Sequence, residues 1–241
     1  MTAVRINLLS GPRNISTAMM YSFRQRADTS VVDEPLYAYY LTRSGAIHPG
    51  RDDVLASQDH DGEAVVRDVI LADHPARVRF FKNMAHHVRG LDRVFLEACV
   101  NIILTREPRD MLRSLTIQVP DATLDGTGLP MQVELLEDIL ARGREPIVVE
   151  SQALLQDPAR VLASLCERIG IGFDSTMLSW PPGPKPEDGI WASHWYDNVH
   201  MSTGFAPYRP RMDPFPARLE PLLAQAAPLY DRLTQFAITP A

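Results

Sequence analysis

Hydroxyl, amide and arginine side chains are concentrated in one short stretch near the start of the chain. Residues 10–17 read SGPRNIST, and they separate an apolar run at residues 4–9 from a helical pattern at residues 16–26. A turn from a strand into a helix presents free backbone N–H groups and the positive end of the helix dipole, which together bind anions such as phosphate. The stretch therefore predicts an anion-binding loop, and the alternative is an ordinary turn with a Ser or Thr helix cap.

The loop lacks the pattern of an ATP-hydrolysing P-loop. That pattern, GxxxxGK[ST], requires a Gly-Lys pair before the hydroxyl residue, and Asn14 and Ile15 stand there instead. Because the lysine and a clear magnesium carboxylate are both missing from the pattern, ATP hydrolysis has little support.

A second candidate anion site follows the apolar run VNIILT at residues 100–105. Residues 106–114 read REPRDMLRS, and Pro108 suits the first position of a helix. Cations are unfavourable in a first helical turn, because the helix dipole is positive there. Arg106 and Arg109 at this place therefore indicate a bound anion instead of a solvated helix start.

These two stretches resemble the nucleotide-binding motifs of the sulfotransferase family. Residues 12–17, PRNIST, are similar to the first motif, P-[KR]-S-G-[ST]-T, with Asn14 for its Ser and Ile15 for its Gly. Residues 106–114 are similar to the second motif, in which an Arg and a Ser eight residues later bind the ribose 3′-phosphate of the donor. Arg106 and Ser114 have that spacing.

A proline-rich segment nearer the C-terminus extends the resemblance. Residues 185–195, KPEDGIWASHW, look like the family's RKGxxGDWxxxF segment, with Pro184 and Pro186 in place of its Arg and first Gly. Residues 149–158 also look like the family's strand-then-helix segment. The matches occur in the family's order and span residues 8 to about 205, most of the chain.

The resemblance implies a P-loop NTPase-like fold and a reaction. The donor is PAPS (3′-phosphoadenosine 5′-phosphosulfate), and its sulfuryl group passes to a hydroxyl or amine of a small-molecule acceptor. Aromatic lid residues either stack on the adenine or pack as core side chains. The residues that the resemblance assigns to the donor are Pro12, Arg13, Asn14, Ser16, Thr17, Arg106, Ser114, Lys185, Gly189 and Trp191.

The departing phosphate of such a reaction needs a cation, since sulfuryl transfer is governed by positioning and charge stabilisation. Arg13 is the predicted cation, because its guanidinium is permanently charged and stabilises the bridging oxygen electrostatically. Lys82, at the end of a strand, is a second candidate, with a surface lysine as the plain alternative. The SO3 group carries less charge than a phosphoryl group, so no metal is required, and no His or carboxylate spacing supports a metal site.

The acceptor needs a base, and two residues are candidates. Glu34 is favoured because it follows a strand, where open α/β sheets place their sites. Residues 33–37, DEPLY, also look like the Glu-Pro segment of bacterial sulfotransferases whose base is a glutamate. His86 is the second candidate, because it follows residues 81–84, FKNM, in the region where cytosolic sulfotransferases carry a Lys-x-His base.

Alternating strands and helices must position these residues. Short β-branched runs alternate with helical periodicity, which predicts an α/β three-layer sandwich with a mostly parallel central sheet. Strands are expected at residues 4–9, 30–33, 79–82, 100–105 and 147–150. Helices are expected at residues 16–26, from Pro108 onward, at 158–169, and at 219–233 with a kink at Pro228.

The 241 residues suit a single sulfotransferase-like domain, residues 1–241. Two stretches do not have a core pattern. Residues 43–75 are polar and are predicted to form a cap, and residues 180–216 contain eight prolines and are predicted to form a lid.

Composition limits the class of partner and compartment. The net charge of −6 argues against nucleic-acid binding. No apolar run approaches the ~20 residues of a membrane span. Cys99 and Cys166 read as buried thiols of a reducing compartment, and with no signal-peptide pattern the prediction is cytoplasmic. The acceptor and the oligomeric state stay open at this stage.

Two other functions share these features. A nucleotide kinase or NTPase on the same P-loop scaffold would depend on magnesium and bind ATP more tightly than PAP, the desulfated product. A non-catalytic nucleotide-binding module would bind PAP without turnover.

Overall fold

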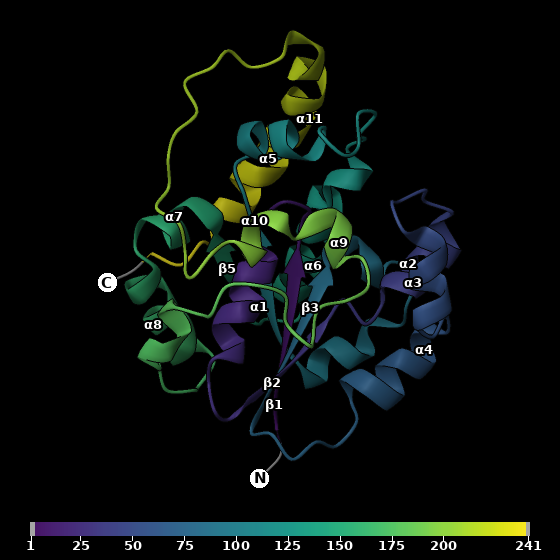
Figure 1. Ribbon diagram of the computed structural model, residues 1–241, viewed down its shortest axis with the longest axis vertical. Coiled ribbons are helices and arrows are strands. Elements are labelled where there is room, and N and C mark those ends of the chain that lie inside the picture. Colours follow the sequence, from purple (N-terminus) through teal and green to yellow (C-terminus); the bar gives the residue numbers. More distant parts are fainter. Residues whose placement is uncertain (1–2, 240–241) are drawn as a thin grey trace. The chain divides into compact units, whose positions relative to one another are not determined.

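The computed structural model describes residues 3–239 and has the predicted α/β architecture (Figure 1). A mostly parallel five-stranded sheet, in the order β2-β3-β1-β4-β5, is flanked by helices. The β2–β3 and β4–β5 pairs are both parallel, with Val31 opposite Phe80 and Ile103 opposite Val148. All five predicted strands are confirmed: β1 (Val4–Ser10), β2 (Thr29–Asp33), β3 (Val78–Met84), β4 (Val100–Thr105) and β5 (Ile147–Glu150).

The helices begin and end largely where their capping residues predict. Asp157 accepts a hydrogen bond from the Arg160 N–H (3.1 Å) as the N-cap of α8, and Gly170, with a φ of 74°, follows its end. The longer helices are α1 (Ser16–Arg24), α2 (Tyr37–Ser44), α5 (Pro108–Leu115), α6 (Leu129–Ala141), α8 (Pro158–Arg168) and α11 (Glu220–Thr234), and the shorter ones are α3 (Arg51–Ser57), α4 (Gly62–Val65), α7 (Ser151–Gln156), α9 (Ala192–Trp195) and α10 (Asp197–His200).

The chain divides into two compact units. Among the described residues, the first unit consists of residues up to Leu8, Thr17–Asn101 and Asp174–Phe205. The second consists of Leu9–Ser16, Ile102–Phe173 and the residues from Ala206 onward. Each unit therefore combines segments that are far apart in the sequence.

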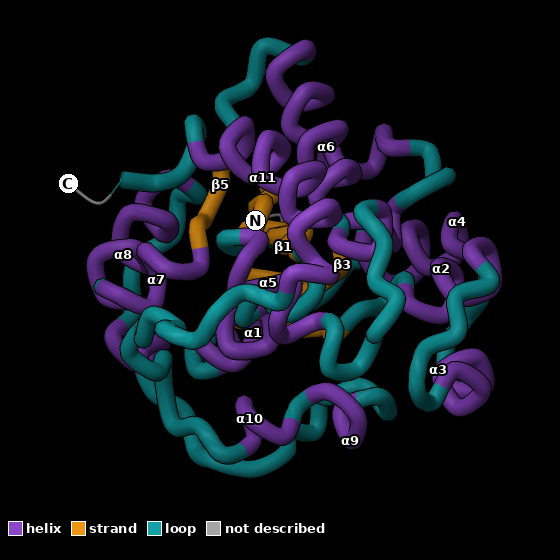
Figure 2. Tube along the Cα trace, turned by 90° about the horizontal axis from the view of Figure 1, so that it is seen from above, coloured by secondary structure: helices purple, strands orange, loops and turns teal. Residues whose placement is uncertain are grey.

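In the first unit, α2 and α3 pack together, and Figure 2 shows them beside α4. Tyr37, Val54 and Trp191 belong to one buried cluster, which joins these helices to α9. Val54 and Ile70 are fully buried, so the prediction that residues 43–75 lie outside the core is wrong at these positions. The polar composition of this segment belongs to the outer faces of short amphipathic helices, whose inner faces are apolar.

In the second unit, α11 packs against α5, α6 and β5 (Figure 1). Leu112, Leu136 and Leu233 contribute to its buried cluster, one from each of the three helices. A polar side chain lies in this core as well. Gln132 of α6 is fully buried, and its Nε2 donates to the backbone oxygens of Leu9 (3.0 Å) and Leu104 (2.7 Å).

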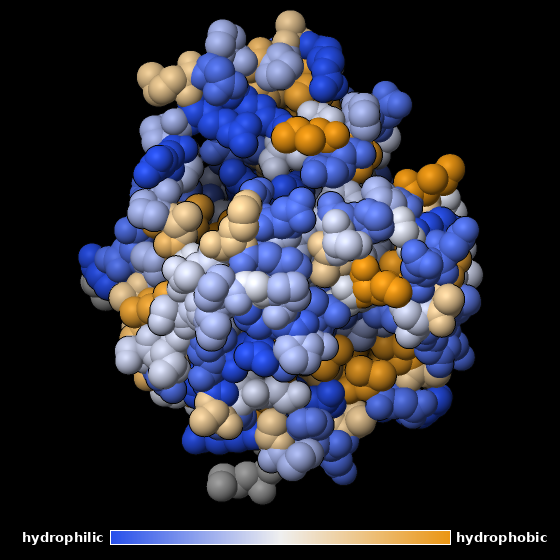
Figure 3. Space-filling view, in the orientation of Figure 1, coloured by the Kyte–Doolittle hydropathy of each residue, from blue (hydrophilic) through white to orange (hydrophobic). Residues whose placement is uncertain are grey.

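The surface and the two thiols match the expectations from composition. Most of the face drawn in Figure 3 is hydrophilic, with apolar side chains in small groups. Within residues 3–239, no helix has the length and apolar character to cross a membrane. Cys99 and Cys166 are buried, as predicted.

Replacing Gln132 by Met is expected to lower the free energy of unfolding by about 2 kcal/mol, because two buried carbonyls lose their common donor while side-chain volume is nearly kept. Urea denaturation measures the change. Gln225→Met on the exposed face of α11 is the control and is expected to have little effect. Equal stabilities of the two variants would contradict this role of Gln132.

Candidate functional site

The anion-binding loop candidate joins β1 to α1 and has an unusual backbone. Arg13 and Ile15 have φ angles of 61° and 60°. This left-handed region favours glycine, and a β-branched residue enters it only at a cost of about 1–3 kcal/mol. Ile15 stands where the family motif has glycine. The loop therefore keeps a glycine-type turn although it lacks the glycine.

Contacts within the second unit hold the loop in this shape. The Asn14 side chain is 2% exposed, and its Nδ2 donates to the Leu104 oxygen (3.0 Å). Ser151 Oγ donates to the Asn14 oxygen at 3.2 Å. A Cβ on Gly11 would lie 2.8 Å from the Thr127 oxygen, so this position has no room for a side chain. Asn14 thus supports the loop through its side chain, and its contact with a nucleotide stays a prediction.

The structure brings Arg13, Arg106 and Ser114 together. Arg13 Nε donates to Ser114 Oγ (2.9 Å), and Arg106 Nη1 donates to the Arg13 backbone oxygen (2.7 Å). Burial, and then the positive charge of Arg106, lower the pKa of the Arg13 guanidinium. Burial also lowers the pKa of Arg106. Since both groups remain cations in water, two positive charges are held close together, and a bound anion would relieve their repulsion.

Arg109 does not join this group. Its guanidinium lies 4.5 Å from the centre of the Phe215 ring and 3.6 Å from the Glu220 carboxylate. An exposed carboxylate and an aromatic ring therefore lie beside its charge, and contact of Arg109 with an anion stays a prediction.

A second candidate group of residues lies in the first unit and centres on Lys82. Lys82 is 1% exposed, so the alternative of a surface lysine is wrong. Its Nζ donates to Asp33 Oδ1 (2.8 Å), to Glu34 Oε1 (2.5 Å) and to the Tyr196 hydroxyl. Glu34 has a φ of 40°, another strained backbone position. A buried charge persists only with such partners.

Charge balance explains how the acidic and basic groups titrate. Burial raises the pKa of Glu34 above its ordinary 4.5, and the Asp33 charge adds to the rise while Lys82 opposes it. Burial alone would lower the pKa of Lys82, but the Asp33 and Glu34 charges raise it well above 10.5. One ammonium therefore serves two carboxylates, which leaves Glu34 with an elevated affinity for a proton.

Two adjacent buried histidines, His86 and His87, follow β3, and their segment is distant from Glu34 in the sequence. Burial is the main cause that lowers the pKa of His86 to about 3, so His86 is neutral and a weak base. His87 is stacked between the rings of Tyr37 (5.0 Å between centroids) and Tyr40 (4.8 Å). His87 Nδ1 lies 4.0 Å from Glu34 Oε2. Sequence reasoning singled out His86, but His87 is the one that approaches Glu34, and no spacing signal distinguishes the two.

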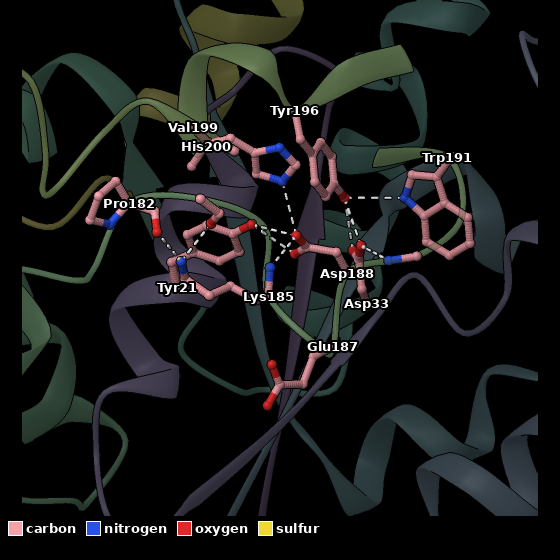
Figure 4. A network of polar contacts seen from close by, with 12 residues as sticks. Tyr21, Asp33, Pro182, Lys185, Glu187, Asp188, Trp191, Tyr196, Val199 and His200 are labelled. Carbon is pink, nitrogen blue, oxygen red and sulfur yellow. Dashed lines mark hydrogen bonds and ion pairs between the residues drawn. The ribbon is translucent and has the colours of Figure 1, made fainter. Parts of the chain in front are cut away.

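The part of the predicted lid that belongs to the first unit, residues 180–205 (called the lid segment below), is held by Asp33 (Figure 4). Asp33 Oδ2 accepts from the Gly189 N–H (3.0 Å) and from the Tyr196 hydroxyl (2.8 Å). Tyr21 donates to Asp188 at 2.7 Å, which adds a second attachment. Asp33 therefore holds both Lys82 and the lid segment.

The lid residues assigned to the nucleotide have internal partners. Trp191 is 3% exposed, and its Nε1 donates to the Tyr196 hydroxyl (3.1 Å). Trp191 therefore packs as a core side chain, which was one of its two predicted roles, the other being to stack on adenine. Lys185 Nζ donates to backbone oxygens of its own turn, including Gly183 (2.6 Å). Nucleotide contacts from Lys185, Gly189 and Trp191 stay predictions. Among residues 3–239, no group of three or more His, Cys, Asp or Glu is placed to hold a metal ion.

A comparison with protein-family models assigns the chain to one family. The model of the sulfotransferase domain matches residues 4–237. The chain belongs to this sulfotransferase family. It is 39% identical over 229 residues to Branched-chain-amino-acid aminotransferase-like protein 1 of Arabidopsis thaliana, a match that covers 95% of the chain and 41% of that protein. The chain thus spans less than half the length of this relative.

Solved sulfotransferase structures have the same fold as this family member. The sulfotransferase from Alicyclobacillus acidocaldarius gives a TM-score of 0.57 at 15% identity, covering 98% of this chain and 96% of that one. The sulfotransferase domain of the Synechococcus PCC 7002 olefin synthase gives 0.52 at 18% identity, covering 94% and 96%. These matches confirm the predicted P-loop NTPase-like fold.

The Asp33→Asn variant is expected to unfold about 3 kcal/mol more easily than the wild type, because a neutral amide cannot replace the charge-assisted hydrogen bonds that the Asp33 carboxylate accepts from Lys82, Tyr196 and the Gly189 N–H. Urea denaturation measures this loss, and faster proteolysis within residues 180–205 would report release of the lid segment. Asp73→Asn is the control, since the exposed Asp73 lies 3.9 Å from Arg5 and is expected to contribute little. An Asp33→Asn variant as stable as the control would refute the arrangement.

Proposed function

We propose that the chain transfers a sulfuryl group from PAPS to a hydroxyl or amine of a small-molecule acceptor. Membership of the sulfotransferase family supports sulfuryl transfer in general. Two contacts support PAPS as the donor: Arg13 donates to Ser114, and Arg106 donates to the Arg13 backbone oxygen. These contacts gather, in one unit, the residues that match both donor motifs of the family.

In the proposed reaction the loop and Arg13 act on the donor. Backbone N–H groups at the start of α1 bind the phosphosulfate. The Arg13 guanidinium is permanently charged and has N–H donors in a fork that suits phosphate oxygens. As the bond between sulfur and the bridging oxygen breaks, negative charge grows on that oxygen, and Arg13 stabilises it. Arg106 and Ser114 hold the 3′-phosphate that distinguishes PAPS from ATP.

Glu34 is the proposed base. As the acceptor oxygen or nitrogen attacks sulfur, its proton passes to the Glu34 carboxylate and PAP leaves with the electrons of the broken bond. Lys82 orients Glu34 through the 2.5 Å bond to Oε1 and does not take the proton. The weak basicity of His86 supports this choice over the histidine. The acceptor is a small molecule in this proposal, with no role for a nucleic acid or a membrane, and a cytoplasmic location fits the two buried thiols.

Isothermal titration calorimetry with PAP and with ATP tests the choice of donor. PAP is expected to bind more tightly than ATP, and Arg106→Ala is expected to weaken PAP binding about 10- to 100-fold, because a charge-assisted contact is lost. Arg109→Ala is the matched control from the first turn of α5, just after Arg106, and its guanidinium lies beside Phe215 and Glu220. If PAP does not bind, or if Arg106→Ala binds it as the wild type does, the proposal fails. Tighter magnesium-dependent ATP binding would favour the kinase alternative.

The pH dependence of turnover tests Glu34 on an acceptor found by screening phenols, alcohols and amines. A base works when it is deprotonated, so the wild-type rate is expected to rise with pH through a pKa that burial places above 4.5. Glu34→Gln is expected to lower kcat about 10²- to 10⁴-fold and to abolish this rise, while PAP affinity is kept. A variant with an unchanged profile would exclude Glu34 as the base. PAP binding without turnover on any acceptor would favour the non-catalytic module.

A further inference from the structure

The Tyr196 hydroxyl joins the lid segment to the buried ammonium of Lys82. It accepts from the Trp191 Nε1–H (3.1 Å) and from Lys82 Nζ, and it donates to the Asp33 carboxylate, 2.8 Å from Oδ2 (Figure 4). A phenol hydroxyl has one hydrogen and two lone pairs, so these contacts use its full capacity. The Tyr196 side chain is buried directly after α9, and its hydroxyl is therefore fixed in orientation.

The three N–H donors of the Lys82 ammonium have three different partner residues. Asp33 Oδ1 (2.8 Å), Glu34 Oε1 (2.5 Å) and the Tyr196 hydroxyl accept one each. Lys82 Nζ also lies 4.9 Å from the centre of the Tyr196 ring, whose face stabilises the positive charge further. No N–H of Lys82 is therefore left for the second oxygen of the Glu34 carboxylate.

This second oxygen, Glu34 Oε2, has no cationic partner. Within residues 3–239, no hydrogen bond reaches it, and His87 Nδ1 lies 4.0 Å away, beyond hydrogen-bond distance. Burial lowers the pKa of His87 well below 6.5, so this imidazole is neutral. The Glu34 side chain is 9% exposed, against 1% for Lys82 and for Asp33, which makes Glu34 the most accessible of the three charged groups.

We propose that Tyr196 is a positioning residue for the base: by occupying the third N–H of Lys82, its hydroxyl leaves Glu34 Oε2 free to take the acceptor proton. The inference rests on the proposed function of Glu34 and deepens it. Tyr196 touches neither donor nor acceptor in this proposal, and it acts through the ammonium. The basicity of Glu34 thus depends on a side chain of the lid segment.

The loss of the Tyr196 hydroxyl has a predictable effect on Glu34. The freed N–H of Lys82 must turn to a carboxylate oxygen. Asp33 Oδ2 still accepts from the Gly189 N–H (3.0 Å), whereas Glu34 Oε2 has no donor, so the N–H is expected to turn to Glu34. A carboxylate that binds an ammonium through both oxygens has a lower affinity for the proton.

The substitution Tyr196→Phe removes the hydroxyl and keeps the ring against Lys82. It leaves the other titratable groups that face Glu34 unchanged, and these are Asp33 of β2, Tyr37 of α2, Lys82 of β3 and His87 after β3. Tyr21→Phe is the matched control. The Tyr21 hydroxyl also holds the lid segment, but it does so by donating to Asp188 (2.7 Å) instead of binding Lys82.

Carboxyl ¹³C NMR of the full chain measures the pKa of Glu34 without an acceptor, and the signal lost in Glu34→Gln assigns the resonance. The wild-type pKa is expected above 4.5, because the carboxylate is buried. Tyr196→Phe is expected to lower the proton affinity of Glu34 about tenfold, so that the pKa falls. Tyr21→Phe is expected to leave this pKa unchanged. Thermal unfolding midpoints verify that both variants keep the fold.

Turnover on an acceptor from the screen gives a second measurement. Tyr196→Phe is expected to lower kcat about 3- to 10-fold and to move the rise of the rate to lower pH, because a weaker base takes the proton. The KM for PAPS is expected to stay within about 2-fold of the wild type, since Tyr196 does not bind the donor. Loosening of the lid segment alone would not move the pH profile.

The outcomes separate this inference from the proposed function. If no acceptor is turned over, the proposed function fails, and the carboxyl titration still decides whether Tyr196 keeps Oε2 free. An unchanged or raised Glu34 pKa in Tyr196→Phe overturns the inference, and so do equal decreases in both Tyr→Phe variants. If Tyr196→Phe does not fold, the wild type decides, because a Glu34 pKa below 4.5 would mean that the ammonium already engages both oxygens.

Discussion

The buried ammonium of Lys82 imposes the strictest constraint on the first unit. A charge with 1% exposure is stable in the interior only when carboxylates and hydrogen-bond acceptors surround it. Asp33 and Glu34 supply those carboxylates from the end of β2, and Tyr196 supplies a hydroxyl from beyond α9. The strained φ of Glu34, 40°, is understandable in this setting, because both consecutive carboxylates must point to one ammonium.

The same constraint links Glu34, the proposed base, to the lid segment. Asp33 accepts from Lys82, from Tyr196 and from the Gly189 N–H, so one carboxylate holds the strand ends and the lid at once. The position of Glu34 therefore depends on contacts made about 150 residues further along the chain. A residue that distant cannot be recognised as part of the site from local pattern.

In the second unit, like charges lie close together, in contrast to the opposite charges around Lys82. Two positive charges lie near one another there, and the charge of Arg106 adds to burial in lowering the pKa of Arg13 within a strained loop. The strain at Ile15 and the repulsion between guanidinia are both costs to folding, and functional sites commonly retain such costs. A bound anion would offset the cost of the repulsion between the guanidinia. In the first unit, carboxylates of the same unit compensate the buried ammonium of Lys82. In the second unit, the proposed anionic ligand would compensate the two guanidinia.

Much of the fold was predictable, since local patterns determine local structure. Every strand was located because β-branched runs bounded by turn residues specify strands regardless of their partners. Caps such as Asp157 and Pro158 specified a helix start in the same way. The segment at residues 43–75 was misjudged because composition averages over both faces of a short helix, and only packing separates the buried Val54 from its polar neighbours.

Sequence alone also determined the family and the identity of most candidate site residues, because order and spacing of motifs survive in the linear chain. Tertiary structure decided what each side chain does. It assigned Lys82 to the interior, Trp191 to a buried aromatic cluster, Lys185 to its own turn and Arg109 to Glu220. It also placed Tyr196 and His87 beside these carboxylates, for which no motif exists. The physical reason is that charge compensation and burial are properties of neighbours in space, and those neighbours come from segments that no local pattern connects.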